Sequence, residues 1–292
     1  MKAAEFDYAR ASSVEEVCRL LDGAAGDGKV IAGGQTLVPL LVMRLARPAL
    51  VVDINAIPML QGIASDASGV TIRAATRQAD ALADPTLQRD LPLLEKALKM
   101  VGHPQTRNRG TIGGSLANAD PAAEICLVAH TLDAVVTARS VKGERQIPIA
   151  DFQLGAMTTA LGAEECLTQV HFPAWRGTGR LGTGFAEMSV RRSDFALVAA
   201  SCQLEIEDGQ CRRLALAIGG AEAAPVRANT VETRLVGTSL EANEIDTAIR
   251  DLEASLDPLS DVHASADYRR RVAASLAARV IVAARDEALA RG

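Results

Sequence analysis

Residues 30–41 read VIAGGQTLVPLL and residues 107–118 read RNRGTIGGSLAN, so the chain carries two pairs of adjacent glycines. Each pair precedes a segment that can begin a helix, and a small hydroxyl residue follows each, Thr36 or Ser115. Glycine has no Cβ and tolerates φ > 0, which allows a ligand to approach the backbone closely. The start of a helix also offers unpaired N–H groups and a partial positive charge. Two such loops therefore predict a diphosphate held from opposite sides.

A single Gly-Gly pair is more often a turn or a tight packing point than a ligand site. Neither stretch has the G-x-G-x-x-G spacing of the dinucleotide fingerprint. Neither ends in the G-K-[ST] of a Walker loop, which disfavours hydrolysis of a nucleoside triphosphate. Spacing and composition therefore indicate a phosphate-bearing cofactor, with Gln35 and Thr36 able to add side-chain hydrogen bonds, and do not identify it.

The composition is that of a globular protein with a sizeable core. The chain has 292 residues, enough for two domains of ordinary size, with 48% hydrophobic and 23% charged residues. Its net charge is −5, and no cluster of Lys and Arg marks a nucleic-acid surface. We therefore expect no nucleic-acid partner.

Neither a membrane span nor a secretion signal is evident. The longest apolar run, residues 37–43, is far shorter than the ~20 residues that a transmembrane helix needs. The N-terminal MKAAEFDYAR lacks the apolar segment of a signal peptide. The sequence thus predicts a cytoplasmic protein without a transmembrane segment.

The cysteines form no recognisable ligand set. They include no C-x-x-C, which favours reduced core thiols over disulfides, a zinc site or an iron–sulfur cluster. They are Cys18, Cys126, Cys166, Cys202 and Cys211. No Ser–His–Asp or Cys–His arrangement supports a hydrolytic function. We therefore expect neither metal ligands nor catalytic residues on this chain.

The N-terminal part has the pattern of a βαβ unit. Ser13 followed by Glu16 predicts a capped helix that the glycine-rich residues 23–28 end. A strand is expected at residues 29–31, a helix at 36–44 and a second strand at 50–54. This unit closes near residue 56.

Further along, the pattern predicts an α/β region followed by an antiparallel sheet. Strands are expected at residues 70–74, 134–138 and 166–172, and helices at 76–83 and 92–100. Residues 107–124 are predicted to be a loop, and residues 173–184, rich in glycine and arginine, a linker. Beyond them the expected elements are two strands at 197–205 and 210–218, a hairpin turn at Glu207-Asp208-Gly209, and a long helix from Asp267.

Three stretches together resemble a known family. They are AGGQTLVPLL at 32–41, RNRGTIGGSLANADPAAE at 107–124 and FAEMSVRRSDFALVAAS at 185–201. The chain resembles the FAD-binding, or medium, subunit of the molybdenum hydroxylases, which include carbon monoxide, xanthine and nicotine dehydrogenases. The resemblance implies an α+β fold. Two FAD-binding subdomains of the PCMH or vanillyl-alcohol-oxidase type, residues 1–56 and 57–177, precede a C-terminal antiparallel sheet with helices, residues 178–292.

The resemblance also implies a role in FAD binding for each stretch. The first loop would surround the diphosphate and ribityl chain, and the second would approach the diphosphate from the other side. Glu124 falls at the adenosine end, and Val101 and Leu167 fall beside the flavin ring. The full expected set is Val30, Ile31, Ala32, Gly33, Gly34, Gln35, Thr36, Leu37, Val101, Gly110, Thr111, Ile112, Gly113, Gly114, Ser115, Asn118, Asp120, Glu124, Leu167, Glu187 and Phe195.

Some of these residues have a structural alternative. Glu124 could cap the segment after Pro121, Asn118 and Asp120 could shape a turn, and Phe195 could belong to the core. Arg191 and Arg192 could stabilise negative charge on a reduced flavin or could be solvated. His103 could face the cofactor, but a structural or surface position is favoured, and Cys202 and Cys211 are expected to pack in the core.

Two positions depart from the family pattern. Glu187 stands where eukaryotic xanthine dehydrogenases have a lysine. The sequence RRSDFA is one residue shorter than the RRHGDFA form of bacterial relatives. Both differences lie in the stretch that the resemblance places around the flavin ring.

The resemblance implies that this chain works with other subunits. Molybdopterin would lie on a large subunit and two [2Fe–2S] clusters on a small one, with FAD passing electrons to an external acceptor. We expect a dimer of heterotrimers. Two alternatives remain open: a stand-alone FAD-dependent oxidoreductase, and a cofactor-free scaffold or maturation protein of the same fold.

Overall fold

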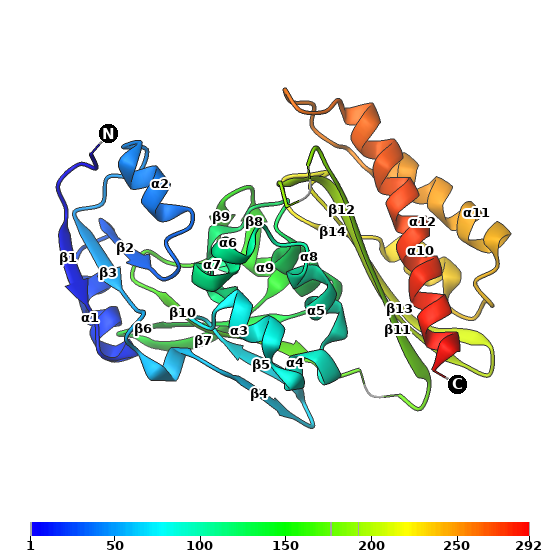
Figure 1. The fold of residues 1–292 in the computed structure, drawn as a ribbon, viewed down its shortest axis with the longest axis horizontal. Coiled ribbons are helices and arrows are strands. Elements are labelled where there is room, and N and C mark those ends of the chain that lie inside the picture. Colours follow the sequence, from blue (N-terminus) through cyan, green and yellow to red (C-terminus); the bar gives the residue numbers. More distant parts are fainter. Residues whose placement is uncertain (1, 176, 192, 292) are drawn as a thin grey trace.

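The computed structural model describes residues 2–175, 177–191 and 193–291, which form three larger sheets arranged along the longest axis of the molecule and one two-stranded sheet. The N-terminal sheet is parallel, in the order β1–β3–β2 (Figure 1). Its elements are β1 (Asp7–Arg10), α1 (Val14–Gly23), β2 (Gly28–Ile31), α2 (Leu37–Val42) and β3 (Leu50–Asp53). The predicted cap is present, since Ser13 accepts a hydrogen bond from the Glu16 amide at 3.2 Å.

The second sheet has five antiparallel strands in the order β4–β5–β10–β6–β7. Its last strand in sequence, β10, lies at the centre of the sheet. The strands are β4 (Ile63–Asp66), β5 (Gly69–Arg73), β6 (Val135–Ser140), β7 (Gly143–Pro148) and β10 (Cys166–Pro173). A short 3₁₀ helix, Pro58–Leu60, leads into it, and a hairpin of β8 (Gln153–Gly155) and β9 (Thr158–Thr159) lies beside it.

Helices cover this sheet and share its apolar core. Leu94 of α5, Ile112 of α7 and Ile125 of α8 are fully buried against strand residues such as Ile72 and Val136. The helices of this region are α3 (Gln78–Ala83), α4 (Pro85–Asp90), α5 (Pro92–Leu98), α6 (Pro104–Arg109), α7 (Ile112–Asn118), α8 (Glu124–Thr131) and α9 (Ile149–Phe152).

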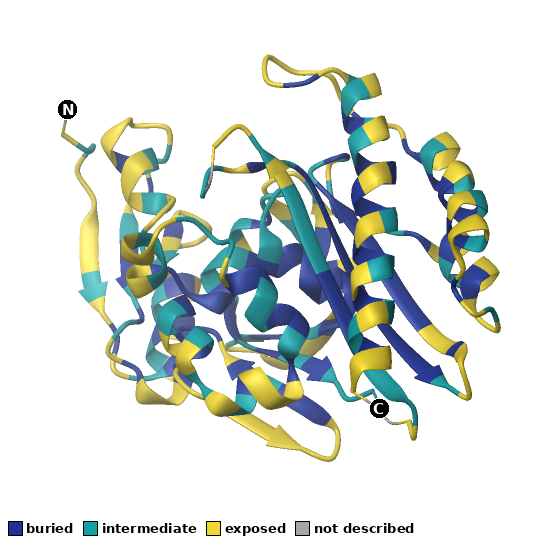
Figure 2. Cartoon of the chain, turned by 45° about the vertical axis from the view of Figure 1, so that its right-hand side comes forward, coloured by how far each residue is buried: buried dark blue, intermediate teal, exposed yellow. Residues whose placement is uncertain are grey.

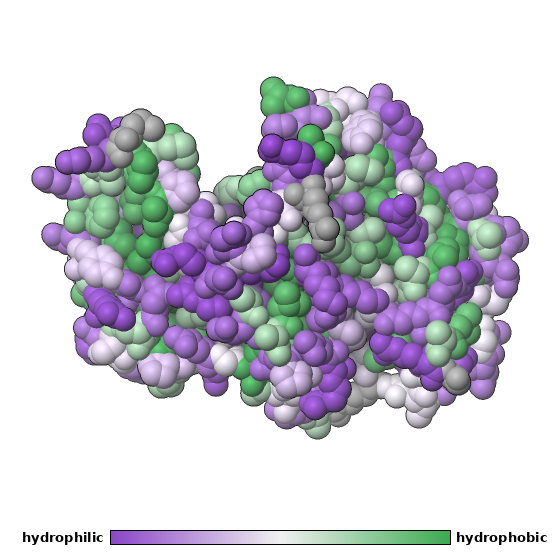
Figure 3. All heavy atoms as spheres, in the orientation of Figure 1, coloured by the Kyte–Doolittle hydropathy of each residue, from purple (hydrophilic) through white to green (hydrophobic). Residues whose placement is uncertain are grey.

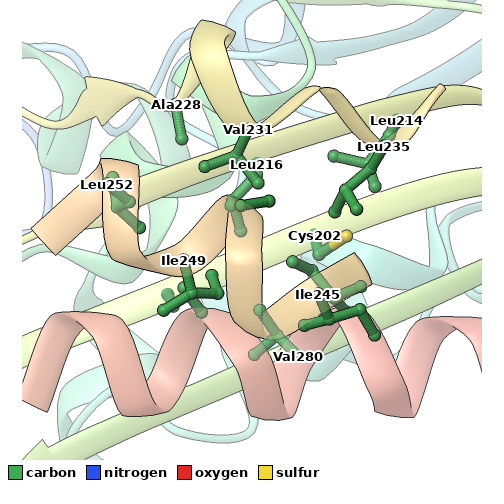
Figure 4. Close-up of a cluster of buried hydrophobic side chains, with 14 of the residues drawn as sticks. Cys202, Leu214, Leu216, Ala228, Val231, Leu235, Ile245, Ile249, Leu252 and Val280 are labelled. Carbon is green, nitrogen blue, oxygen red and sulfur yellow. The ribbon is translucent and has the colours of Figure 1, made fainter. Parts of the chain in front are cut away.

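The C-terminal part is an antiparallel sheet with helices packed on it, as predicted. The strands follow the order β11–β12–β13–β14, with bounds Arg180–Ser189, Ala196–Glu207, Gln210–Gly219 and Val226–Arg227. The helices are α10 (Asn229–Leu235), α11 (Ala242–Ser255) and α12 (Ala266–Ala290). Figure 2 shows buried residues along the inner faces of these elements, and Figure 4 shows the cluster that they enclose.

Two predictions about local structure were wrong. Residues 107–124, expected to be a loop, contain the end of α6, all of α7 and the start of α8. Residues 173–184, expected to be a linker, include the first half of β11. There a Cβ on Gly182 or Gly184 would lie 1.8 Å or 2.1 Å from a carbonyl oxygen of α12, so these glycines allow close helix–sheet packing.

The cysteine prediction is confirmed, since all five cysteines are buried and unpaired. Among the described residues, no three His, Cys, Asp or Glu side chains come together in a way that could hold a metal ion. Within the same residues, none of the helices combines the length and apolar character needed to cross a membrane.

Candidate cofactor site

The first glycine loop connects β2 to α2 and leaves its amides without partners. No backbone N–H of residues 33–37 donates a hydrogen bond to any residue that the structure describes. Gly34 has φ +70°, and Thr36 returns to right-handed helical angles. Alternation of left-handed and right-handed backbone conformations can turn successive N–H groups toward one side, an arrangement suited to binding an anion. The chain thus presents five consecutive donors at the end of a parallel strand.

The second glycine pair has a packing role within the protein. Gly113 donates to the carbonyl of Ala74 at 2.9 Å, and Gly114 donates to the Thr111 hydroxyl at 3.0 Å. A Cβ on Gly113 would lie 2.5 Å from the Cβ of Ala74, so this glycine allows α7 to pack directly on the end of β5. Both amides are thus occupied within the chain, and the expectation that this glycine pair approaches a diphosphate stays a prediction. Ser115 donates its amide to the Thr111 carbonyl at 3.2 Å.

The two glycine stretches nevertheless lie against each other. A Cβ on Gly33 would be 2.3 Å from the carbonyl oxygen of Arg109 and 2.9 Å from the Cα of Gly110. Gly110 and Ile112 are fixed in turn, because the Gly110 carbonyl accepts from Gln78 at 2.9 Å and the Ile112 amide donates to Thr76 at 3.0 Å. The unpartnered amides of the first loop therefore lie beside a rigid second segment. In Figure 3 the surface is hollowed between the lobe that carries α2 and the part that carries α6 and α7.

Three carboxyl groups gather near the far end of α7. Burial, opposed in part by a backbone hydrogen bond and reinforced by the carboxylates of Glu187 and Asp120, raises the pKa of Glu124 to about 8. Burial raises the pKa of Glu187 to about 7. Both side-chain oxygens of Glu187 are buried and have no hydrogen-bond partner among the described residues. Asp120 accepts from the amide of Ala122 at 2.9 Å, the turn geometry considered as its structural alternative.

Asp120 and Phe195 line a common cavity of about 370 Å³ between the α7–α8 loop and the C-terminal sheet. Phe195 is 74% exposed, so the alternative that it belongs to the core is wrong. Arg191 is solvated and pairs with Asp194 at 3.2 Å, whereas Arg192 lies outside the described residues. Asp194, Phe195 and Ala196 thus form one wall of the cavity, with an aromatic ring at its surface.

Val30 and Ile31 lie on β2, and the predicted residues not yet placed lie in the part of the chain that carries the five-stranded sheet. Val101 is partly buried on the helix-covered core, and Leu167 is buried in β10. Asn118, at the end of α7, donates to the sulfur of Met157 at 3.5 Å. His103 is exposed, as expected, at the start of α6.

Two residues that the sequence does not reveal donate hydrogen bonds to the backbone of the two glycine stretches. Asn55 donates to the carbonyl of Ala32 at 2.9 Å, and Arg77 donates to the carbonyl of Arg109. Asn55 lies one residue beyond the end of β3, a position typical of polar side chains that support loops. Arg77 carries no sequence signal. Both side chains donate to backbone carbonyls, which every residue type has, so no sequence motif marks the two positions.

Comparison with known proteins gives matches along nearly the whole chain. Residues 4–175 match the family described as the FAD binding domain in molybdopterin dehydrogenase. Residues 183–284 match the CO dehydrogenase flavoprotein C-terminal domain. The chain is 39% identical to the 6-hydroxypseudooxynicotine dehydrogenase complex subunit alpha of Paenarthrobacter nicotinovorans, over 97% of this chain and 96% of that protein.

Solved structures agree with these matches. A chain of quinoline 2-oxidoreductase from Pseudomonas putida 86 is 35% identical and superposes with a TM-score of 0.94, over 99% of this chain and all of that one. A chain of carbon monoxide dehydrogenase from Hydrogenophaga pseudoflava gives the same TM-score and coverage at 30% identity. The fold described above is therefore shared with these chains from end to end.

Proposed function

Because the chain belongs to the FAD-binding medium subunits of the molybdenum hydroxylases, we propose that it is the flavin-carrying electron-transfer subunit of such a dehydrogenase. It receives electrons from [2Fe–2S] clusters on a small partner subunit. A large partner subunit binds molybdopterin and oxidises the substrate. The flavin then reduces an external acceptor, and the chain acts within a dimer of heterotrimers.

The observation that supports this proposal most directly is the run of five unpartnered amides at residues 33–37, set against the Arg109–Gly110 backbone. A diphosphate carries oxygens that can accept several N–H bonds at once. Because Gly33 has no Cβ, the loop that carries these amides can lie directly against the Arg109–Gly110 backbone. The residues present thus fit the diphosphate of FAD. The hydroxyl of Thr36 lies in the same loop and is exposed.

The other predicted residues would complete the site. Glu187 has two buried oxygens without donors, so it can accept hydrogen bonds from hydroxyl or amino groups of the cofactor. Glu124 carries its proton near neutral pH and can therefore also donate. When bound, FAD supplies the ability to exchange electrons singly and in pairs. The chain contributes the position of the cofactor, the exclusion of water and the charge of its surroundings.

The cysteines support the assignment of the clusters to another subunit. Each of the five is buried, and burial raises the pKa of Cys126 and Cys202 above the usual range, which opposes the thiolate form that iron requires. The relative from Paenarthrobacter nicotinovorans is itself named as the subunit of a complex. Electrons would therefore reach this chain from a partner.

The proposal is tested by purifying the full chain, adding FAD and recording the visible spectrum before and after dithionite. We expect a yellow protein with bound FAD that bleaches on reduction but does not oxidise an organic substrate alone. Co-expression with the genes for a cluster-bearing small subunit and a molybdopterin-binding large subunit should restore substrate-dependent bleaching. A chain that never retains FAD would support the scaffold alternative, and substrate-dependent bleaching by the isolated chain would support the stand-alone oxidoreductase.

A further inference from the structure

We propose that Arg77 and Asn55 are positioning residues that hold the two glycine stretches at the separation which FAD binding requires. The inference rests on the proposed function, because it concerns the same site. It assigns a role to two side chains that donate hydrogen bonds to backbone carbonyls of the two stretches.

A continuous chain of hydrogen bonds joins the two stretches. The Arg77 guanidinium donates to the carbonyl of Arg109, directly before Gly110, and also to the Oδ1 of Asn55 at 2.6 Å. The Asn55 amide group donates to the carbonyl of Ala32 at 2.9 Å, directly before Gly33. One arginine and one asparagine thus connect the residue before the first glycine pair to the second glycine stretch.

The direction in which Asn55 points is itself fixed. Its Nδ2 donates to the Oδ1 of Asp53 at 2.6 Å, and its backbone amide donates to the same oxygen at 2.8 Å. The other carboxylate oxygen of Asp53, Oδ2, accepts a hydrogen bond from the Tyr8 hydroxyl at 2.5 Å. The orientation leaves the Asn55 Oδ1 free to accept from Arg77. The chain of contacts therefore begins on β3 of the N-terminal sheet and ends on α6.

This connection matters because the two stretches belong to different sheets. The first follows β2 of the parallel sheet, and the second follows α6 above the antiparallel sheet. Gly33 touches the Arg109–Gly110 backbone without a hydrogen bond between them among the described residues. Van der Waals contact prevents closer approach but does not prevent separation. The Arg77–Asn55 chain supplies the attraction that keeps the loops together.

An arginine suits this position better than other residues. Its planar fork directs donors toward two acceptors at once, whereas a lysine presents a single ammonium group. Burial and the nearby charge of Arg109 lower the pKa of Arg77, while Asp80 and Asp53 oppose that change, and the group remains charged at physiological pH. The two hydrogen bonds are therefore charge-assisted and strong.

The test measures FAD affinity of the full chain by flavin fluorescence quenching. Arg77→Ala should weaken FAD binding about tenfold to hundredfold, since it removes charge-assisted hydrogen bonds. Arg77→Lys should recover only part of the loss. Guanidinium ion at tens of millimolar should restore affinity to Arg77→Ala, because it can occupy the vacated space. Rescue of this kind would not follow from a general loss of stability.

Arg89→Ala is the matched control, because Arg89 is exposed and pairs with its neighbour Asp90. It should bind FAD as the unmodified chain does, with or without guanidinium. Asn55→Ala should weaken binding similarly, and the Arg77→Ala/Asn55→Ala double variant should be little worse than either, because both break the same chain. Asn55→Ala also keeps the test decisive if Arg77→Ala does not fold.

Two results would overturn the inference: native FAD affinity in Arg77→Ala, or additive losses in the double variant without guanidinium rescue. Failure of the unmodified chain to bind FAD would instead refute the proposed function. The two failures are thus distinguishable within one experiment.

Discussion

Gly33 is the residue at which the two glycine stretches touch, and its missing side chain is what permits the contact. The sequence predicted a role for this glycine through ligand approach, and the structure adds a packing reason within the protein. Gly113 also has a packing reason, since its amide donates to Ala74 and its missing Cβ allows α7 to lie on that residue. A glycine pair in a sequence does not distinguish these cases, because both need the absence of a Cβ.

Gly33→Ala should therefore impair FAD binding. A methyl group 2.3 Å from the Arg109 carbonyl oxygen must force the loops apart. Overpacking of this kind costs about 1–3 kcal/mol, or roughly 5- to 150-fold in dissociation constant if it falls on the bound state. Titration of the full chain with FAD checks this expectation. Gly23→Ala is the control, because a Cβ there meets nothing within 4 Å, and equal affinities for the two variants would contradict the prediction.

Glu124 and Glu187 give the FAD-free protein a pH-dependent stability. Their pKa values of about 8 and about 7 lie above the ordinary 4.5, so the folded state binds more protons than the unfolded state between these limits. The stabilisation is complete below pH 4.5 and is lost as pH rises through 7 and 8. Buried His130, whose pKa is lowered to about 4, opposes this trend only below its ordinary 6.5. The window from about pH 6.5 to 8.5 is therefore diagnostic.

Glu187→Gln should flatten the pH dependence in this window. The amide cannot ionise, so the variant should unfold at a higher temperature than the native chain at pH 8 and should differ less at pH 6.5. Thermal melts of the FAD-free protein at both pH values measure this. Exposed Glu144→Gln serves as the control and should follow the native curve. A native-like slope in Glu187→Gln would show that this carboxyl does not titrate as described.

At the scale of elements, the strongly periodic segments were predicted and the glycine-containing ones were not. The capped helix α1, the β12–β13 strands and the long α12 follow directly from hydrophobic period and turn chemistry. α7 contains Gly113 and Gly114, which have poor helix propensity, and β11 contains Gly182 and Gly184, which have poor strand propensity. In both elements tertiary packing overrides propensity, because a neighbouring element comes too close for any side chain.

Gly184→Ala should accordingly destabilise the C-terminal sheet. Its Cβ would lie 2.1 Å from the Val280 carbonyl oxygen in the middle of α12, where neither backbone can move easily. We expect the free energy of unfolding to fall by about 3 kcal/mol, the upper part of the range for overpacked sites. Denaturant unfolding measures the change, with Gly155→Ala as a control because open space surrounds that position. A loss below about 1 kcal/mol would mean that α12 shifts freely on the sheet.

For the whole molecule, one link between the FAD-binding part and the C-terminal part is an ion pair. Lys96 of α5 donates to Glu287 of α12 at 2.7 Å and to the carbonyl of Thr183 of β11 at 2.7 Å. Glu287 also accepts from the amide and the hydroxyl of Thr183. Burial alone would raise the pKa of Glu287, but the hydrogen bonds from Lys96 and Thr183 outweigh it and hold the pKa at about 2.

Glu287→Gln should make the protein less stable at neutral pH and less sensitive to acid. A lowered carboxyl pKa contributes stability that is present above the ordinary 4.5 and is lost as pH falls toward 2. After allowance for solvent screening, we expect a loss of about 1 kcal/mol at pH 7 that vanishes near pH 2. Denaturant unfolding at pH 7 and acid titration measure the two effects. Exposed Glu144→Gln should show neither, and a constant difference at all pH values would contradict the assignment.

The position of β10 has a consequence for how this protein is made. The strand occupies the centre of the five-stranded sheet, where Phe172 pairs with Val70 and His171 pairs with Val135. A nascent polypeptide emerging from the ribosome cannot complete that sheet until residue 173 is free, although strands from residue 63 onward have already appeared. Closing so long a stretch is entropically costly and slow. During translation, the unfilled gap between β5 and β6 exposes strand edges to mispairing, so we expect chaperones to matter most in this interval.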